Sequence, residues 1–248
     1  MLAKLKKIPS VYSAHGLYGI ASKLTALSPH PQLFFVGGIV LMCVRELKLP
    51  SIVGALACHY QIERISSVSL HEAVQCGPAE DCAVLGPEFR RYLERGAVGI
   101  AIRSEGKMVA YNWAFQHTYD LKFSNGARLV VQMTPATVFL GNGYIDPAYR
   151  MRGLFPLMIR ESASAFGEGR CCWSSTDLWN DISLASHRRV GFTRIATVSC
   201  ATLLGATWFG LEGSDRRGWT LIRGGGLQVS DDDVDLAASR RSGRQPET

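Results

Sequence analysis

Residues 144–156 constrain this chain of 248 residues more than any other segment. An apolar, β-rich run ends at Ile145, Pro147 prevents its continuation as a strand, and the basic turn 150–155 leads directly into a helical pattern. A helix start exposes unpaired N–H groups at the positive end of the helix dipole, so the turn predicts an anion site. A plain strand-to-helix turn with solvated arginines fits these residues equally well.

Two features of the turn favour a diphosphate as the anion. Gly153 lacks the Cβ atom that would hold a phosphate away from the backbone. Arg150 and Arg152 add positive charge and forked donor groups that match phosphate oxygens. Asp146, between an aliphatic residue and a proline, is interpreted as structural.

The overall charge also indicates an anionic partner. The formal net charge is +6, although Asp231, Asp232, Asp233 and Asp235 lie near the C-terminus, so the preceding residues are more basic still. The basic residues are dispersed without an aromatic platform, which disfavours nucleic acid. Sequence motifs for nucleotide hydrolysis, zinc binding and serine hydrolysis are absent, so we expect no metal.

Seven cysteines without a Cys-x-x-Cys pair predict free thiols in a reducing compartment. No signal-peptide pattern follows Lys4, Lys6 and Lys7, and we expect a cytoplasmic protein. The most apolar run, residues 33–44, is too short to span a bilayer. We interpret it as a hairpin that turns at Gly37 and Gly38.

Residues 2–27 carry apolar side chains at helical spacing with lysines between them, and the pattern is interrupted near Gly16. The alternatives are helices packed on the domain and a helix in contact with a membrane surface. The predicted organisation is an N-terminal extension of amphipathic helices and hairpin (1–50), one domain (51–229) and a disordered tail (230–248).

The periodicity after residue 60 changes several times between helical and extended patterns. The expected elements are helices in pieces over 61–95 with breaks at Pro78, Gly86 and Pro87, a hairpin of 97–103 with 107–116, a strand pair of 128–133 with 137–145, a helix over 156–167, a strand over 171–175, a helix over 182–190 and a β-rich run over 192–204. This order predicts an α+β fold with a mixed, mostly antiparallel sheet flanked by helices.

In two of these segments the chain resembles the GNAT (Gcn5-related N-acetyltransferase) superfamily. The cofactor signature of that family is an aliphatic-x-Pro strand end followed by Arg/Gln-x-x-Gly-x-Gly/Ala, and residues 145–147 and 150–155 follow it except at Phe155. A second family element, an Asn, a helix and a Gly-Phe pair, matches residues 180–192. The hairpin at 97–116 resembles the family's second and third strands, so the resemblance covers roughly residues 60–210.

The resemblance implies direct transfer of an acyl group from acetyl-CoA or another acyl-CoA to an amine. It assigns His187 as the acid that protonates the leaving thiolate, and Asp177 is the first candidate for the base. A helix-terminal role for His187 and a capping role for Asp177 are the structural alternatives. The implied cofactor contacts are Tyr144, Ile145, Arg150, Met151, Arg152, Gly153, Leu154, Phe155 and Asn180.

The acceptor implied by the resemblance is a small-molecule primary amine, such as an amino sugar or an amino acid. One alternative is an acyltransferase that takes longer acyl chains from acyl-carrier protein, because a basic surface suits an acidic carrier and Phe155 departs from the cofactor signature. The other is a GNAT-shaped binding module without catalysis, and a homodimer is a further expectation. Acceptor identity depends on loops that vary freely on one fold.

Overall fold

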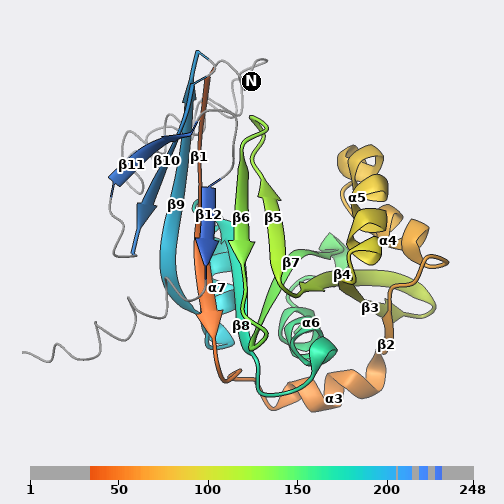
Figure 1. The fold of residues 1–248 in the computed structure, drawn as a ribbon. Helices are drawn as coiled ribbons and strands as arrows, with labels where there is room; N and C mark the ends of the chain where they lie inside the picture. Colours follow the sequence, from red (N-terminus) through yellow and green to blue (C-terminus); the bar gives the residue numbers. More distant parts are fainter. Residues whose placement is uncertain (1–33, 205, 214–217, 223–226, 231–248) are drawn as a thin grey trace, which may run out of the picture.

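The computed structural model describes residues 34–204, 206–213, 218–222 and 227–230 (Figure 1). The larger sheet consists of β1 (Phe34–Val44), β2 (Gln61–Arg64), β3 (Val98–Ser104), β4 (Lys107–Phe115), β7 (Thr137–Ile145), β8 (Cys171–Asp177), β9 (Thr193–Leu203), β10 (Ala206–Glu212) and β11 (Gly218–Ile222). The smaller sheet consists of β5 (Thr118–Lys122), β6 (Arg128–Gln132) and β12 (Leu227–Ser230). The helices are α3 (Ile52–His59), α4 (Leu70–Cys76), α5 (Cys82–Glu94), α6 (Leu154–Ala163) and α7 (Asp181–Arg189).

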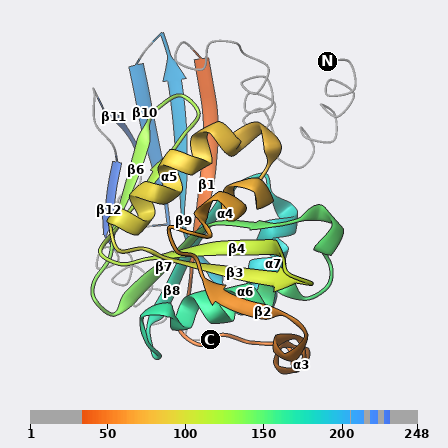
Figure 2. The same cartoon turned by 90° about the vertical axis from the view of Figure 1, so that its right-hand side faces the viewer.

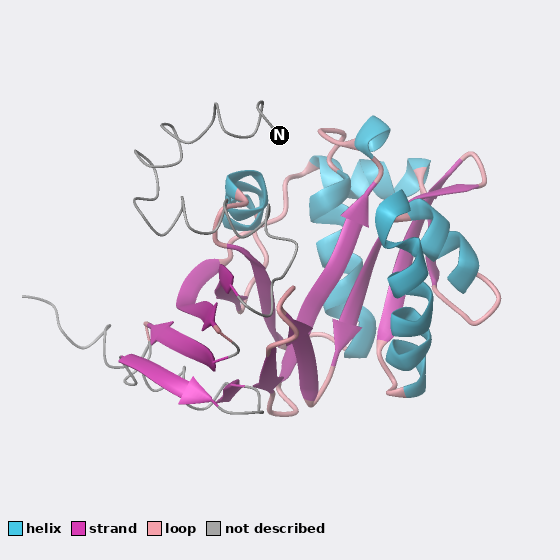
Figure 3. Ribbon diagram, turned by 90° about the horizontal axis from the view of Figure 1, so that it is seen from above, coloured by secondary structure: helices cyan, strands magenta, loops and turns pink. Residues whose placement is uncertain are grey.

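Helices flank the larger sheet, as the view from above shows (Figure 3). Most neighbouring strands in it run antiparallel, and β7 and β8 form a parallel pair. The predicted α+β class is therefore confirmed. The predicted N-terminal helices within residues 2–27 lie outside the described residues. So does the predicted tail 230–248, except for Ser230, which ends strand β12. None of the helices that the structure describes is long and apolar enough to cross a membrane.

The hairpin predicted at Gly37 and Gly38 is wrong, because β1 is one continuous strand of 11 residues. It lies in the middle of the sheet, paired antiparallel with β8 on one side and with β9 on the other (Figure 1). At Gly37 a Cβ atom would lie 2.5 Å from the ring of Phe35, so the glycine makes room for that ring. The strand belongs to the main sheet and not to a separate N-terminal hairpin.

The strand pair predicted for 128–133 and 137–145 is also wrong, although both strands exist. β6 pairs with β5, a strand that we did not predict, and with β12. β7 pairs instead with β4 and β8 in the larger sheet. Nearness in sequence favours pairing between consecutive strands, and here the connection between β6 and β7 crosses from one sheet to the other.

Between residues 61 and 95 the prediction of helical pieces is only partly right. Residues 61–64 form strand β2 at the edge of the sheet, where they pair with β3. The predicted break at Gly86 and Pro87 is wrong, because Pro87 lies inside α5. The hairpin of β3 and β4, strand β8 and helix α7 are confirmed. The predicted helix 156–167 exists but starts two residues earlier, at Leu154.

The two faces of the larger sheet are covered by different helices. Helices α4 and α5 cover the face that holds Tyr111, Trp113 and Phe139, and Figure 2 shows both helices in front of the strands. Helix α6 packs on the other face, against β3, β4 and β7, and α3 packs on α6. The segment between β7 and α6, residues 146–153, therefore passes from the end of β7 to the face of the sheet that α6 covers.

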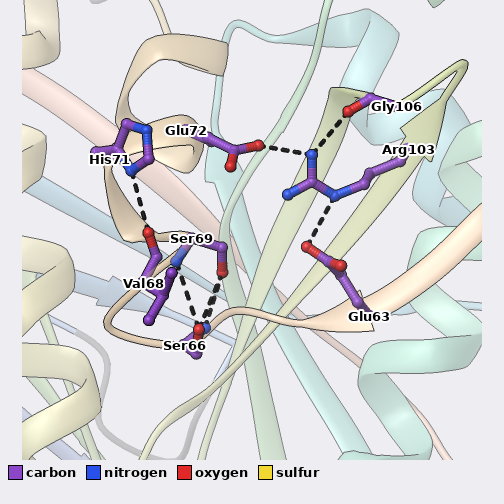
Figure 4. A network of polar contacts seen from close by, with 8 residues as sticks. All are labelled: Glu63, Ser66, Val68, Ser69, His71, Glu72, Arg103 and Gly106. Atoms are coloured by element: carbon purple, nitrogen blue, oxygen red, sulfur yellow. Dashed lines mark hydrogen bonds and ion pairs between the residues drawn. The ribbon is translucent and has the colours of Figure 1, made fainter.

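Arg103 ties the β3–β4 hairpin to the edge strand and to α4 (Figure 4). Its Nε donates to Glu63 of β2 at 2.9 Å, and its Nη1 donates to the Gly106 carbonyl at 2.9 Å. The same Nη1 lies 2.6 Å from Glu72 of α4, and this ion pair lowers the pKa of the Glu72 carboxyl. The hairpin that borders β7 is thereby fixed at its outer end.

Candidate functional site

The parallel strands β7 and β8 separate before they end. Their ladder stops at Leu140 and Ser174, whereas β7 continues to Ile145 and β8 to Asp177. Beyond the ladder, β7 stays paired with β4 and β8 stays paired with β1. We call the two diverging segments, residues 141–145 and 175–177, the strand fork. In this fork, the backbone N–H and C=O groups of β7 that face β8 have no strand partner.

A bulge in β7 lies within the strand fork. The register between β4 and β7 shifts at Asn112, and opposite it Asn142 adopts a left-handed conformation with φ of 52°. The Asn142 side chain donates to the Tyr92 hydroxyl at 3.0 Å, and that hydroxyl donates to Glu88 at 2.8 Å. Burial raises the pKa of Tyr92, so the phenol keeps its proton. This chain of hydrogen bonds holds the bulge from the α5 side.

On the α6 face, the bulge places Gly143 directly against Asn112. A Cβ atom on residue 143 would lie 2.5 Å from Asn112 Oδ1 and 3.2 Å from the methyl group of Met158. Asn112 is 3% exposed, and its Nδ2 has no hydrogen-bond partner among the described residues. The carboxamide oxygen of Asn112 thus lies beside Gly143 in the strand fork.

The turn 150–155 has the backbone geometry of an anion site. Met151 and Gly153 both adopt left-handed conformations, with φ of 62° and 78°, and α6 starts at Leu154. No backbone carbonyl in the described part of the chain accepts from the amides of Met151, Arg152 or Gly153. The first amides of α6 are likewise unpaired by helix geometry, and Pro156 stands in the first turn, where it removes no hydrogen bond.

Both arginines of the turn are exposed, and an aromatic ring lies under each. The guanidinium of Arg152 lies 4.9 Å from the ring centroid of Tyr149. That of Arg150 lies 5.9 Å from the ring of Tyr144, and its Nε donates to the Ile145 carbonyl at 3.2 Å. The Met151 side chain is 92% exposed. The turn therefore presents two cations and a row of amides to solvent, at the edge where β7 ends.

Asp146 has the structural role that the sequence indicates. Its carboxylate accepts from the Ala148 amide at 2.9 Å and from Lys107 at 3.1 Å, and both contacts lower its pKa. It closes the short turn after β7 and is already paired with a cation.

The last two residues of the turn contribute only backbone to its surface. Leu154 is buried in the core beneath α6. Phe155 is partly buried and packs edge-on against His187, with ring centroids 4.9 Å apart. The departure from the family signature at this position therefore places an aromatic ring in the core and not over the turn.

His187 lies in the core between α7 and β8 and is 5% exposed. Its Nδ1 donates to the Ser183 carbonyl at 2.8 Å, so its Nε2 accepts from the Ser174 hydroxyl at 3.0 Å. Burial lowers the pKa of His187 from its ordinary value of 6.5. This arrangement gives the neutral imidazole a packing role, and proton donation by His187 stays a prediction.

Asn180 and Asp177 lie at the same edge of the sheet as the turn, because β7 and β8 are parallel. Asn180 is the N-cap of α7, where its Oδ1 accepts from the Ser183 amide at 3.0 Å. Asp177 is exposed at the end of β8, and its carbonyl accepts from the Asn180 amide. Strand alternation places its side chain on the same face as Trp173, which is the face that α4 and α5 cover.

The structure brings most of the predicted residues to one edge and leaves His187 in the core. Tyr144, Ile145, Asp177, Asn180 and the turn 150–155 all lie where β7 and β8 end. Sequence reasoning missed Asn112, Gly143 and the chain from Asn142 through Tyr92 to Glu88. The pair of glycines around Asn142 was the one available signal, since Gly-Asn-Gly interrupts an otherwise apolar strand.

No family model matches the chain, and no curated protein does either. Among solved structures, it is similar to a conserved protein of unknown function from Staphylococcus epidermidis at 12% identity and a TM-score of 0.47, over 71% of this chain and 64% of that one. A GNAT acetyltransferase from Colwellia psychrerythraea matches at 14% identity and a TM-score of 0.46, over 67% and 55%. AAC(6')-Iy, in complex with the bisubstrate analogue CoA-S-monomethyl-acetylneamine, matches at 18% identity and a TM-score of 0.42, over 54% and 91%.

The chain spans less than two thirds of the length of the first two of these proteins. With TM-scores below 0.5, the likenesses carry no argument about function, and the fold rests on the chain's own topology. The hairpin β3–β4, the strand–turn–helix unit from β7 to α6 and the strand–helix–glycine unit from β8 to Gly191 occur in the predicted order. Together, these units have the order that the sequence resemblance to the GNAT superfamily implies.

Proposed function

We propose that this chain is an acyltransferase that moves an acetyl or other acyl group from acyl-CoA to a primary amine of a small molecule, by direct transfer. One observation carries the proposal: a basic turn with free amides and a left-handed glycine opens α6 at the end of a strand fork. The turn suits a diphosphate, and the fork suits the extended pantetheine arm of coenzyme A, which needs backbone hydrogen-bond partners.

The residues of the turn fit the diphosphate of coenzyme A. The unpaired amides and the start of α6 supply donors and positive potential. Arg150 and Arg152 are exposed on the same turn and supply two forked cations. Tyr144 and Ile145 are the residues of the fork nearest to the turn, so the pantetheine arm would run from the turn along the backbone of β7.

Acyl transfer then needs a base for the amine and a proton for the leaving thiolate. The amine nitrogen forms a bond to the acyl carbon, the carbon–sulfur bond breaks, and the amine loses one proton. Asp177 is the proposed base, because it is exposed at the open end of the fork. His187 is retained as the proposed proton source for the thiolate through Ser174, the last residue of the β7–β8 ladder. This role needs the protonated ring, in which Nε2 donates to the Ser174 hydroxyl and that hydroxyl passes on its own proton.

A thermal-shift and calorimetric screen tests the proposal. Acetyl-CoA, propionyl-CoA, a long-chain acyl-CoA, free CoA and holo acyl-carrier protein are added separately to the full chain. A ligand at 100 times its Kd stabilises the folded state by about 2.7 kcal/mol, which corresponds to roughly 5–10 °C for a chain of this size. We expect stabilisation by CoA thioesters, whereas no stabilisation by any CoA species would refute the proposal. Stabilisation by holo acyl-carrier protein alone would assign the donor to the carrier.

A further inference from the structure

The hairpin of β9 and β10 has two exposed leucines at its tip. Leu203 is 54% exposed and Leu204 is 81% exposed, and Leu204 has a positive φ of 51°. Single exposed leucines are common on protein surfaces, whereas an adjacent pair at the tip of a hairpin concentrates apolar surface at one point. We call these two residues the leucine tip.

The leucine tip lies beyond the end of β8. The ladder between β1 and β8 ends where Ile39 pairs with Asp177, whereas the ladder between β1 and β9 continues to the pair of Phe34 and Leu203. Because β1 is antiparallel to both β8 and β9, these last pairs extend the sheet in the direction in which β8 runs. The leucine tip and the open end of the strand fork therefore face the same way.

The surroundings of the leucine tip carry cations. The tip of the β5–β6 hairpin is joined to this end of the sheet, because Asn125 donates to the Thr202 hydroxyl at 2.6 Å. Lys122 and Arg128 are cross-strand neighbours in that hairpin, and both are exposed. Asp120, further along β5, is already paired with Arg128. No Asp or Glu occurs among the described residues around the two hairpin tips, which are 34–36, 121–129, 201–204 and 206–208.

Residues 1–33 join the sheet at this same end, because they lead directly into Phe34. Their sequence has apolar residues at helical spacing and no Asp or Glu, and its lysines are Lys4, Lys6, Lys7 and Lys23. Packed on the protein here, these lysines would meet cations, and the described residues around the two tips offer them no carboxylate. An anionic lipid surface accepts both the apolar side chains and the lysines of such a segment.

We propose that this end of the molecule binds the surface of an anionic membrane. Leu203 and Leu204 insert among the lipids, and the lysines of residues 1–33 contact the headgroups. Two contacts act together, because a single short apolar anchor gives only marginal membrane binding. The inference goes beyond the proposed function and does not depend on it. Bound in this way, the protein turns the open end of the strand fork toward the membrane.

Flotation of the full chain with lipid vesicles tests the proposal. Vesicles of phosphatidylglycerol and phosphatidylcholine should carry the protein upward in a density gradient, and vesicles of phosphatidylcholine alone should carry far less. The difference should shrink as salt rises. Leu204→Asn should melt like the parent, because asparagine tolerates a positive φ. Its partition into anionic vesicles should fall about tenfold.

A second variant tests the lysines. Lys4, Lys6 and Lys7 are changed together to glutamine in the full chain, and partition into anionic vesicles should fall about tenfold or more. Val68→Asn is the matched control for the leucine tip, because Val68 is likewise 81% exposed but lies between β2 and α4. This control should float with anionic vesicles like the parent.

Two results would overturn the inference. One is a parent protein that does not float with anionic vesicles at low salt, and the other is a Leu204→Asn variant that floats as well as the parent. If the parent floats with neither kind of vesicle and the lysine variant melts at a lower temperature, residues 1–33 pack on the protein and the membrane assignment is wrong. Neither measurement uses an acyl donor, so the proposed function is tested separately.

Discussion

The side-chain amide of Asn142 donates to the hydroxyl of Tyr92 at 3.0 Å, and this bond links the bulge of β7 to helix α5. Tyr92→Phe removes that acceptor and also the hydrogen bond to Glu88. We expect a loss of about 1–2 kcal/mol in the free energy of unfolding and weaker binding of acetyl-CoA, because Asn142 is no longer held in its left-handed conformation. Urea unfolding and calorimetry measure the two effects. Parental affinity for acetyl-CoA in a folded Tyr92→Phe protein would contradict this role of the bond.

Arg152→Ala should weaken acyl-CoA binding by about 1.5–3 kcal/mol, the range for hydrogen bonds to charged groups. Arg150→Ala should weaken it similarly and also release the Ile145 carbonyl, to which Arg150 donates. Both effects should shrink as salt rises. Calorimetric titrations at two ionic strengths measure these losses of affinity. Arg188→Ala is the control, because Arg188 is an exposed cation at the C-terminal end of α7, away from the turn. Equal affinities in all these proteins would remove the turn from the donor site.

Gly153→Ala should impair both folding and donor binding. Residue 153 has φ of 78°, where a Cβ atom is strained, and that atom would lie 2.7 Å from Leu56 of α3. We expect a loss of roughly 1–2 kcal/mol in the free energy of unfolding. Gly126→Ala is the matched control, because Gly126 has φ of 84° with nothing within 4 Å. It should lose similar stability and keep its affinity for acetyl-CoA, and a Gly153 variant with parental affinity would contradict the role of the turn.

Asp177→Asn should lower kcat by roughly 10²–10⁴ if Asp177 accepts the amine proton. The Kd for acetyl-CoA should stay unchanged, because this side chain lies at the end of β8 and not on the turn. Initial rates are measured with the best acceptor from a panel of amino sugars and amino acids. Glu88→Gln is compared in parallel, and a larger loss in that variant would transfer the role to Glu88.

His187 should make stability depend on pH. Burial lowers its pKa in the folded protein below the ordinary value of 6.5, so the unfolded chain binds the proton more readily. The contribution of His187 to the free energy of unfolding is complete above about pH 6.5, and it is lost as the pH falls from there through the pKa of the folded state. His187→Phe should flatten this part of the stability curve in urea unfolding at several pH values. If His187 also protonates the thiolate, the folded variant should lose roughly 10²–10⁴ in kcat; turnover within a few-fold of the parent would leave it a packing role only.

The sequence predicted those parts of the fold that depend on neighbouring residues. Ser104, Glu105 and Gly106 favour a tight turn, and Glu105 and Gly106 adopt the positive φ values that such a hairpin requires. The turn 150–155 and helix α6 follow from Pro147, Gly153 and the apolar spacing after them. These signals come from residues close together in the sequence, so they do not depend on how distant strands pair.

Features that depend on distant strands were not predictable in this way. Gly37 and Gly38 suggest a turn, but between two long partners they accommodate the ring of Phe35 within a continuous strand. The contact between Asn112 and Gly143 depends on the register between β4 and β7, which a bulge shifts by one residue. No local pattern around Asn112 records that shift.

The placement of β1 between β8 and β9 has a consequence for how the chain is made. Phe34 pairs with Leu203, and Val44 with Cys172, so this strand leaves the ribosome long before either partner exists. Until then it is an apolar segment without a sheet, of the kind that associates with other chains. The second half of the sheet can close only after most of the protein has been synthesised, and such long-range closure is slow. A truncation that removes β1 would leave β8 and β9 as two new unpaired edges in the middle of the molecule.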